Sequence, residues 1–398
     1  MLGLAYLTER NSLFRNSALP PSGRTRTTSS ALRPVAVRPR HAPSDTRRVT
    51  VSPPKPADAT RVRRRHGRPA LSAGLLAAAL VLAAVSVLSL AVGSGDVALH
   101  DVVAGVFSPD RSVHGQMVVQ EVRLPRTFAG LLAGSALGVA GALMQGVARN
   151  PLADPGLLGV NAGASVTVVF AISVLSLTEP AQYIWFGFLG ACVAAVLVHG
   201  IGSLGREGAT PVKLALAGAA TTAVLGSLTS AMLLRDSRTF DQFRFWQVGA
   251  LNGRDIDVLW QALPFVAVGG VPALLLGPSL NALALGDDIA RGLGQRIVAM
   301  RLAGAASVVL LCGAATAIAG PIGFLGLAVP HAARLITGPD YKWILPYSAL
   351  LAPALLLFAD VVGRLIARPG EVQVGVITAA LGAVPFVLLV RRRNVVEL

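Results

Sequence analysis

Charge is scarce in this chain of 398 residues. Only 14% of the residues are charged, against roughly 25% in soluble domains, while 53% are hydrophobic. From residue 69 onward the few charges lie in clusters, and long uncharged stretches separate them. A soluble core could not bury that much apolar surface. We therefore expect a protein that crosses a membrane several times and is surrounded mainly by lipid.

Lysine and cysteine are also rare, which excludes several kinds of site. None of the three lysines, Lys55, Lys213 and Lys342, completes a G-x-x-x-x-G-K-[ST] phosphate loop, so ATP binding of that kind is excluded. The two cysteines, Cys192 and Cys312, lie singly in apolar stretches and lack the paired spacing of a metal or redox site. We expect no catalysis, no directly bound cofactor and no metal ligand.

Nine uncharged stretches are long enough to cross a bilayer, whose hydrocarbon core takes about 20 apolar residues. The seventh is too long for one helix, and Gly320-Pro321 divides it into a span ending near Ala319 and another from about Ile322 to Ile336. This gives ten predicted spans. The nine stretches are Pro69–Gly95, Thr127–Ala148, Pro155–Thr178, Pro180–Gly205, Leu214–Leu234, Val258–Gly286, Leu302–Ala333, Trp343–Ala359 and Val372–Val390.

Basic residues flank the first and last spans and predict the orientation. Arginines between Arg61 and Arg68 precede the first span, and Arg391-Arg392-Arg393 follow the last. Basic residues favour the cytoplasmic side, so both termini should be cytoplasmic. Two cytoplasmic ends require an even number of crossings, which ten satisfies and nine does not.

The first 68 residues have a different composition. They carry 15 of the 35 lysines and arginines, three acids, and many Ser, Thr and Pro residues. Such a segment cannot bury a core, so we expect a disordered basic cytoplasmic tail (1–68) before the transmembrane domain (69–398). Contact with anionic lipid, nucleic-acid binding and a targeting role are each compatible with this tail. A solvated tail requires none of them, and we expect no nucleic-acid partner.

A short internal repeat points to a transporter architecture. The segment Gly134–Gly141 resembles Gly313–Gly320 at an offset of 179 residues, and the same offset relates Pro151 to Pro330. The copies begin in spans two and seven, and an odd difference in span number means opposite orientation. We therefore expect an all-α, polytopic membrane protein of about ten transmembrane helices with an inverted internal repeat.

Two breaks in the apolar stretches indicate either a solute pathway or simple kinks. Asn150-Pro151 and Gly320-Pro321 free backbone polar groups, which a membrane tolerates only inside protein or along a wet cavity. The span interiors hold hardly any acids, and Asp360, placed at an outer helix end, is the nearest candidate for coupling to an ion. A chain with neither an ATP site nor an ion site looks like the channel-forming part of a larger machine. An ion-coupled secondary transporter is the alternative.

Six motifs stand in order along residues 70–393. They are Arg123-Leu-Pro-Arg126 with Gly141-Ala-Leu-Met-Gln145, Asn150-Pro-Leu-Ala-Asp-Pro-Gly-Leu-Leu-Gly159, Trp246-Gln-Val-Gly249, Leu283-Ala-Leu-Gly-Asp-Asp-Ile-Ala-Arg-Gly-Leu-Gly294, Gly320-Pro-Ile-Gly-Phe-Leu-Gly-Leu-Ala-Val-Pro-His331 and Ala359-Asp-Val-Val-Gly-Arg364. Together they resemble the FecCD-type permeases of bacterial ABC importers for iron-siderophores and cobalamin. The chain departs from that pattern around the tenth span, at Gln373 and Pro385.

The resemblance implies an assembly. A permease of this family has ten helices and works as a dimer, of identical chains or with a sister permease, in the lipid of the bacterial plasma membrane. The pathway lies at the subunit interface. Two separate ATPase subunits dock beneath and hydrolyse ATP, and an extracytoplasmic binding protein delivers the cargo. We expect the cargo to be a ferric siderophore, with cobalamin or haem as the alternative.

The resemblance also assigns roles to three groups of residues. Arg123, Arg126 and Arg364 should dock the binding protein, because the family's arginines there meet acidic residues and a planar guanidinium pairs bidentately with a carboxylate. Interfacial snorkelling is the alternative explanation for them. Asp287 and Asp288 suit the positive end of a short helix between two glycines, which should couple the chain to the ATPase. The complete coupling group is Gly286, Asp287, Asp288, Ala290, Leu293 and Gly294.

The third group lies along the predicted pathway. Its members look like structural breaks near the cytoplasmic gate, at the inner ends of spans two and eight, and we expect none of them to bind the substrate. The gate group is Met144, Gln145, Asn150, Pro151, Pro330 and His331.

Overall fold

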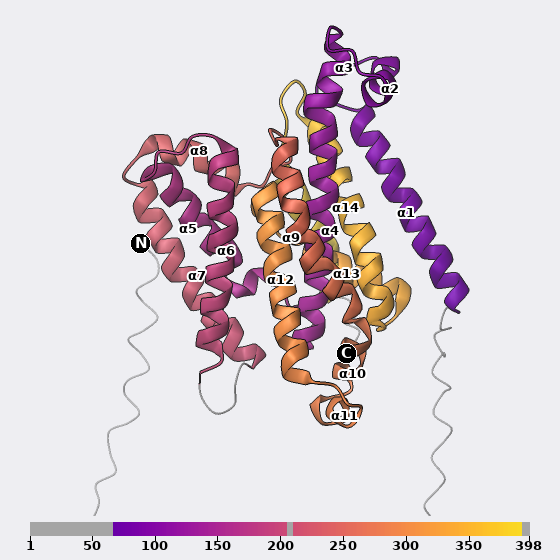
Figure 1. Cartoon of the computed structure of the whole chain (residues 1–398), viewed down its shortest axis with the longest axis vertical. Coiled ribbons are helices and arrows are strands. Elements are labelled where there is room, and N and C mark those ends of the chain that lie inside the picture. The colour runs from indigo at the N-terminus through magenta and orange to yellow at the C-terminus, as the bar shows by residue number, and fades with distance from the viewer. Residues whose placement is uncertain (1–66, 205–209, 392–398) are drawn as a thin grey trace, which may run out of the picture. The chain divides into compact units, whose positions relative to one another are not determined.

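The computed structural model describes residues 67–204 and 210–391 (Figure 1), and every regular element within these residues is a helix. Apart from its last two residues, the predicted basic tail (1–68) lies outside the described residues. Of the three arginines that follow the last predicted span, Arg391 is described and the other two lie outside the described residues.

Ten helices occupy the places of the ten predicted spans. Seven of them are long and apolar enough to cross a membrane, and α5, α13 and α15 are the three others. The predicted polytopic, all-α architecture is confirmed for the described residues. The ten helices are α1 (Arg68–Ala91), α4 (Leu124–Ala148), α5 (Val160–Ser173), α6 (Pro180–Gly202), α7 (Pro211–Leu233), α9 (Ile256–Leu275), α12 (Ile297–Ala319), α13 (Leu325–Thr337), α14 (Tyr341–Ile366) and α15 (Val374–Arg391).

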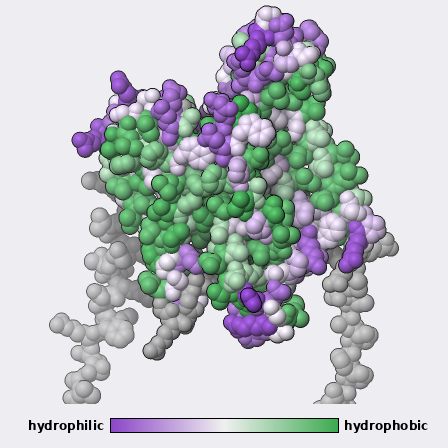
Figure 2. All heavy atoms as spheres, viewed as in Figure 1, coloured by the Kyte–Doolittle hydropathy of each residue, from purple (hydrophilic) through white to green (hydrophobic). Residues whose placement is uncertain are grey.

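Short helices lie at the two ends of this bundle and carry much of its polar surface. We call the end with α2 (Leu99–Phe107), α3 (His114–Val118) and α8 (Ser237–Gln247) the outer end. The end with α10 (Gly277–Ala284) and α11 (Asp287–Gly292) is the inner end. Figure 2 shows hydrophilic residues gathered at these ends and a hydrophobic band between them, as expected of a protein that crosses a bilayer.

The predicted break at Gly320-Pro321 is present, and it has a counterpart in the first half of the chain. Helix α12 ends at Ala319, and α13 begins five residues beyond Gly320, whose φ of 72° lies in the region that favours glycine. Helix α4 ends at Ala148 and is followed by a 3₁₀ turn, η2 (Pro155–Leu158), and then by α5. In Figure 1, α4 descends toward the inner end and α12 rises from it, which is the arrangement of an inverted repeat.

The sequence match that suggested the repeat is not in structural register. Gly134–Gly141 lies in the middle of α4, whereas Gly313–Gly320 lies at the end of α12. Both segments are rich in small residues because both sit in close helix contacts, and this similarity of packing produced the match. One predicted span is divided in the structure. The stretch Val258–Gly286, predicted as one helix, forms two, α9 and α10, which meet at Leu276.

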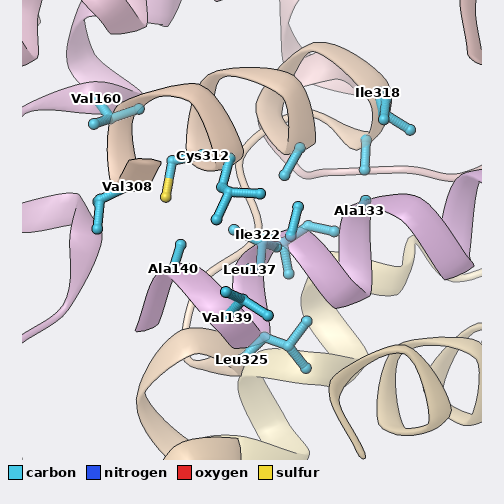
Figure 3. Packing of buried hydrophobic residues seen from close by; sticks show 14 of the residues in the cluster. Ala133, Leu137, Val139, Ala140, Val160, Val308, Cys312, Ile318, Ile322 and Leu325 are labelled. Atoms are coloured by element: carbon cyan, nitrogen blue, oxygen red, sulfur yellow. The ribbon is translucent and has the colours of Figure 1, made fainter. Parts of the chain in front are cut away.

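Helix α4 is the centre of the bundle and packs against α12, α13 and α14. Its glycines make this possible. A methyl group on Gly134 would overlap the backbone of Pro353 in α14, and one on Gly141 would overlap the carbonyl of Gly326 in α13. Figure 3 shows the resulting core, in which residues of α4, α12 and α13 such as Leu137, Cys312 and Leu325 interdigitate. Close backbone approach replaces the hydrophobic drive that lipid cannot supply.

Glycines also join three segments at the outer end. The N–H of Ala250 donates to the carbonyl of Ala319 at 2.8 Å, and the N–H of Gly375 donates to the carbonyl of Gly249 at 3.2 Å. A side chain on Gly375 would overlap the backbone next to Gly249. The start of α15 and the end of α12 are therefore both fixed to the loop that follows α8.

Candidate functional site

The three predicted docking arginines lie together at the outer end, and all three are buried. Arg123 is 3%, Arg126 is 6% and Arg364 is 1% exposed. Arg123 ends the π-helical turn that precedes α4, Arg126 lies in the first turn of α4, and Arg364 lies in the last turn of α14. Because α4 and α14 pack along their length, these turns face one another instead of the solvent.

Arg126 is the centre of a charge network. Its Nε donates to both carboxylate oxygens of Asp360, at 3.2 and 2.9 Å, and its Nη2 donates to Asp360 Oδ1 at 2.8 Å. Its Nη1 donates to Glu371 at 2.7 Å, and Arg364 lies 3.0 Å from the other oxygen of Asp360. Asp360 is only 1% exposed, and a buried carboxylate requires such compensation. Asp360, which the sequence offered as a candidate for coupling to an ion, thus forms ion pairs with two arginines.

The guanidinium groups of Arg123, Arg364 and Arg368 also donate hydrogen bonds to backbone carbonyls at the outer end of α1. Arg123 donates through Nη1 to the carbonyls of residues 90 and 91, each at 2.8 Å. Arg364 donates to the carbonyls of residues 89 and 92 at 3.0 and 2.7 Å, and Arg368 donates to that of residue 93 at 2.8 Å. The last carbonyls of a helix have no intrahelical donor and carry partial negative charge, so cations stabilise them. Few side chains of α1 are buried, so these contacts add to the packing of α1 against α14.

Glu371 extends the network into the loop between α14 and α15. Burial alone would raise the pKa of its carboxyl group, but the charge and the hydrogen bond of Arg126 lower that pKa below its ordinary value of 4.5. The Ser94 hydroxyl donates to the second carboxylate oxygen at 2.9 Å. Glu371 is therefore ionised at neutral pH and holds the loop against α4.

Docking requires a guanidinium group that a partner can reach, and the three arginines already have internal acceptors. A carboxylate of a binding protein would have to replace Asp360, Glu371 or the carbonyls of α1. The docking role stays a prediction, and the structure adds a second role: these arginines join α1, α4 and α14. The sequence offered one signal of this, since Asp360 and Glu371 lie beside the same outer helix ends as the arginines.

At the inner end, the predicted coupling segment forms a short helix between two glycines. Gly286 and Gly294 have φ of 109° and 80°, values that favour glycine, and α11 lies between them. Ala290 is buried in a small inner cluster with Leu283 and residues of α12, while Leu293 is exposed. The side chain of Asp288 is fully exposed and pairs with Arg291 of the same helix, at 2.8 Å.

Asp287 has partners that sequence reasoning missed. Arg149, at the end of α4, donates to its Oδ1 at 2.6 Å, and Arg301, in α12, donates to both of its oxygens at 3.1 Å. Asp287 therefore connects α11 to the end of α4 and to α12. Arg149 lies 138 residues away in the chain, so only the fold brings this pair together.

The structure divides the predicted gate group in two. Met144 and Asn150 line a cavity of about 140 Å³ at the inner end, between α4, α6, α7 and α12. Gln145 is turned away from it, and its amide donates to the carbonyl of Leu327 in α13 at 3.3 Å. His331 is buried in α13, and neither of its ring nitrogens has a hydrogen-bond partner among the described residues.

Asn150 also shapes the backbone, and the two prolines of the gate group lie beside other members of the group. The Asn150 side chain accepts from the N–H of Leu152 at 2.9 Å, which turns the chain at the end of α4, and Pro151 lies within this turn. Pro330 lies inside α13, one residue before His331. In the part of the chain that the structure describes, no three His, Cys, Asp or Glu side chains gather closely enough to hold a metal ion.

In the described residues, two helices of opposite orientation each end in a break, and a short helix lies at one end of the bundle. This arrangement is typical of integral membrane transport proteins. Comparison with known sequences names the family. Residues 80–392 match the FecCD transport family, and the chain belongs to this family. A member of this transport family with several apolar helices is a multi-pass membrane protein.

Relatives of known assignment cover most of the chain. The ferric enterobactin transport system permease protein of Escherichia coli is 47% identical over 79% of this chain and 94% of its own length. A probable siderophore transport system permease protein of Bacillus subtilis is 43% identical over 72% and 86%. The cobalamin import system permease protein of Halobacterium salinarum is 39% identical over 70% and 75%.

A solved structure has the same fold. It is an inward-facing conformation of a metal-chelate type ABC transporter, and it superposes with a TM-score of 0.71 at 26% identity. The superposition covers 81% of this chain and 99% of that one.

Proposed function

We propose that this chain is the membrane-spanning permease subunit of an ABC importer for ferric siderophores, in the bacterial plasma membrane with both termini cytoplasmic. The observation that carries this proposal is the 47% identity to the ferric enterobactin permease over 94% of that protein's length. The sequence has no phosphate-binding loop, so ATP hydrolysis falls to separate ATPase subunits. A second permease, identical or a sister chain, completes the membrane part.

The inner end supports the proposed ATPase contact. Leu285, Ile289 and Leu293 expose 60%, 54% and 61% of their surface around the short helix α11. Ile289 and Leu293 are four residues apart, so they point to the same side. Exposed apolar side chains on a polar end of the molecule are a typical docking surface for another protein.

The outer end is the proposed contact of the binding protein. Arg123, Arg126 and Arg364 are its proposed anchors, on the condition that acidic residues of the partner exchange with their internal acceptors. Charge reversal at Arg364 should then weaken binding of the partner and loosen α1 at the same time. Binding measured by surface plasmon resonance at two salt concentrations, beside a melting curve, separates the two effects. Full binding by a folded Arg364→Glu variant would remove the arginine from the docking site.

For the inner gate, the cavity beside Met144 and Asn150 marks the proposed constriction. Its wall is largely apolar, with Arg149 and Arg301 at its edge. We propose no substrate ligand here, since a large chelate in transit is best passed by a wide and weakly interacting surface.

Uptake by cells with and without the gene tests the cargo. We expect loss of radiolabelled iron uptake from ferric enterobactin, with uptake of cobalamin unchanged. Loss of cobalamin uptake instead would favour the second candidate, which the similarity to the cobalamin permease supports, and would change the cargo but not the mechanism. Unchanged uptake of ferric enterobactin, ferric hydroxamate, ferric citrate and cobalamin would contradict the proposal.

A further inference from the structure

One carboxylate at the inner end bridges two guanidinium groups from different helices. Asp287 begins α11 and accepts from Arg149 at 2.6 Å and from Arg301 at 3.1 Å. We call these three residues the inner triad. Its side chains are between 25% and 38% exposed, so they lie at the edge of the protein interior. The triad joins α11 to the end of α4 and to the first turns of α12.

The backbone of Arg149 adopts a conformation that is unfavourable for an arginine. Arg149 closes α4 with φ 49° and ψ 37°, in the left-handed region. This conformation is unfavourable for a residue other than glycine, and glycine is the usual residue at this place in a helix end. The helix-ending bond from the N–H of Asn150 to the carbonyl of Gln145, 3.1 Å long, would form with glycine as well. The arginine is therefore explained by its side chain, which reaches Asp287.

Few other contacts determine the orientation of α11. Its only buried residue is Ala290, and the residue before it, Gly286, adopts a φ of 109° with open space around it. A glycine of this kind is a natural hinge. The triad opposes movement about this hinge, because Asp287 is the first residue after it.

The two sides of the segment are suited to receive and to pass on a movement. Ile289 and Leu293 are exposed and available to a partner below the bundle. Asp287 faces back to Arg149, whose neighbour Asn150 lines the inner cavity of about 140 Å³, as do Arg149 and Arg301 themselves. A displacement of α11 would pull directly on the wall of this cavity.

We infer that the inner triad transmits movement of α11 to the inner ends of α4 and α12, and that Arg149 and Arg301 are positioning residues of transport. The inference rests on the proposed function, because it needs an ATPase that moves α11. Without the triad, α11 would keep only its chain connections to α10 and α12 and the packing of Ala290 in the small inner cluster. ATP hydrolysis would continue, but less of it would lead to transport.

The experiment uses the complete transporter in liposomes, with its ATPase subunits and binding protein, and ferric enterobactin as the probe. The readout is the amount of ligand imported per ATP hydrolysed. Arg149→Gly should lower this ratio at least threefold, with unchanged recovery of the ATPase subunits. Its melting temperature should not fall, because glycine relieves the left-handed backbone. Asp287→Asn should lower the ratio similarly, and Asp287→Glu should restore most of it.

Lys342→Gln is the matched control, since it removes one exposed cytoplasmic cation at the start of α14 without touching Asp287. Its ratio should equal that of the wild type. A folded Arg149→Gly transporter whose ligand-to-ATP ratio stays within a factor of two of the wild type would overturn the inference.

A second measurement needs no cargo, so its outcome does not depend on which compound the transporter imports. Spin labels at positions 152 and 291, in a chain with Cys192 and Cys312 replaced by alanine, report the distance between the end of α4 and α11. With the triad intact, this distance should stay constant when ATP is added to the assembled transporter, and in Arg149→Gly it should change. A wild-type distance that changes with ATP would refute the proposed role of the triad. This holds even if the transporter imported none of ferric enterobactin, ferric hydroxamate, ferric citrate and cobalamin.

Discussion

The buried network at the outer end gives the sharpest prediction about stability. Arg126→Met removes the central guanidinium and keeps a side chain of similar length. Removing one partner of a buried ion pair destabilises a protein by about 3–5 kcal/mol. We expect the lower value, about 3 kcal/mol, because Asp360 keeps Arg364 as a partner and Glu371, whose side chain is 23% exposed, can rehydrate.

Asp360→Asn should be more harmful although it changes fewer atoms. It removes the countercharge of Arg364 and one of the two countercharges of Arg126, which keeps Glu371. Arg364 is 1% exposed and its other acceptors are neutral, so we expect a loss of about 4–5 kcal/mol. Combining Asp360→Asn with Arg126→Met should cost less than the sum of the two single changes, because both remove the Arg126–Asp360 pair; only the Arg126–Glu371 contact is lost in addition.

The assay is unfolding of the purified permease by sodium dodecyl sulfate in mixed micelles, followed by circular dichroism. Arg111→Met is the control, since Arg111 is exposed on an outer loop, and its effect should stay within about 0.5 kcal/mol. If Arg126→Met unfolded at the same detergent fraction as Arg111→Met, the network would not stabilise the fold. A change in affinity for the binding protein without a change in stability would favour a free docking arginine instead.

Two further predictions follow from the same structure. Because the pKa of Glu371 is lowered, its ionised form stabilises the folded state above pH 4.5, and this contribution is lost as the pH falls below 4.5 through the folded-state pKa. Melting temperatures between pH 6 and pH 3.5 should therefore fall more steeply for the wild type than for Glu371→Gln, and parallel curves would contradict the assignment. Gly141→Ala should prevent accumulation of folded protein in the membrane, because the new methyl group overlaps the carbonyl of Gly326. Gly226→Ala in α7 is its control, since nothing lies near that position, and it should be neutral or slightly stabilising; equal yields of the two variants would argue against the close contact of α4 and α13.

The spans could be predicted from the sequence because lipid imposes a simple rule. A membrane helix needs an uninterrupted apolar stretch, so charges and Gly-Pro pairs mark its ends. That rule located even the short α13 beyond Gly320-Pro321. The rule fails for α2, α3 and α8, which carry polar residues and lie at the outer end, where charge no longer separates a helix from a loop.

The candidate sites were predicted less completely, for a different reason. Sequence reasoning found Arg126 and Asp287 but not their partners, because Asp360 and Arg149 lie 234 and 138 residues away. Pairing over such distances depends on which helices pack together, and the apolar pattern of a span does not encode its neighbours. What the sequence does show is the side of the membrane on which each charge lies, and opposite charges on one side are the available signal.

The most direct test of the central claim is import by the purified transporter. Liposomes would contain this chain with its ATPase subunits, and would be supplied with the binding protein and radiolabelled ferric enterobactin. We predict accumulation that requires all three components and ATP hydrolysis, and that no proton or sodium gradient can replace. Accumulation driven by an ion gradient without the ATPase subunits would contradict the account and would make the chain a secondary transporter.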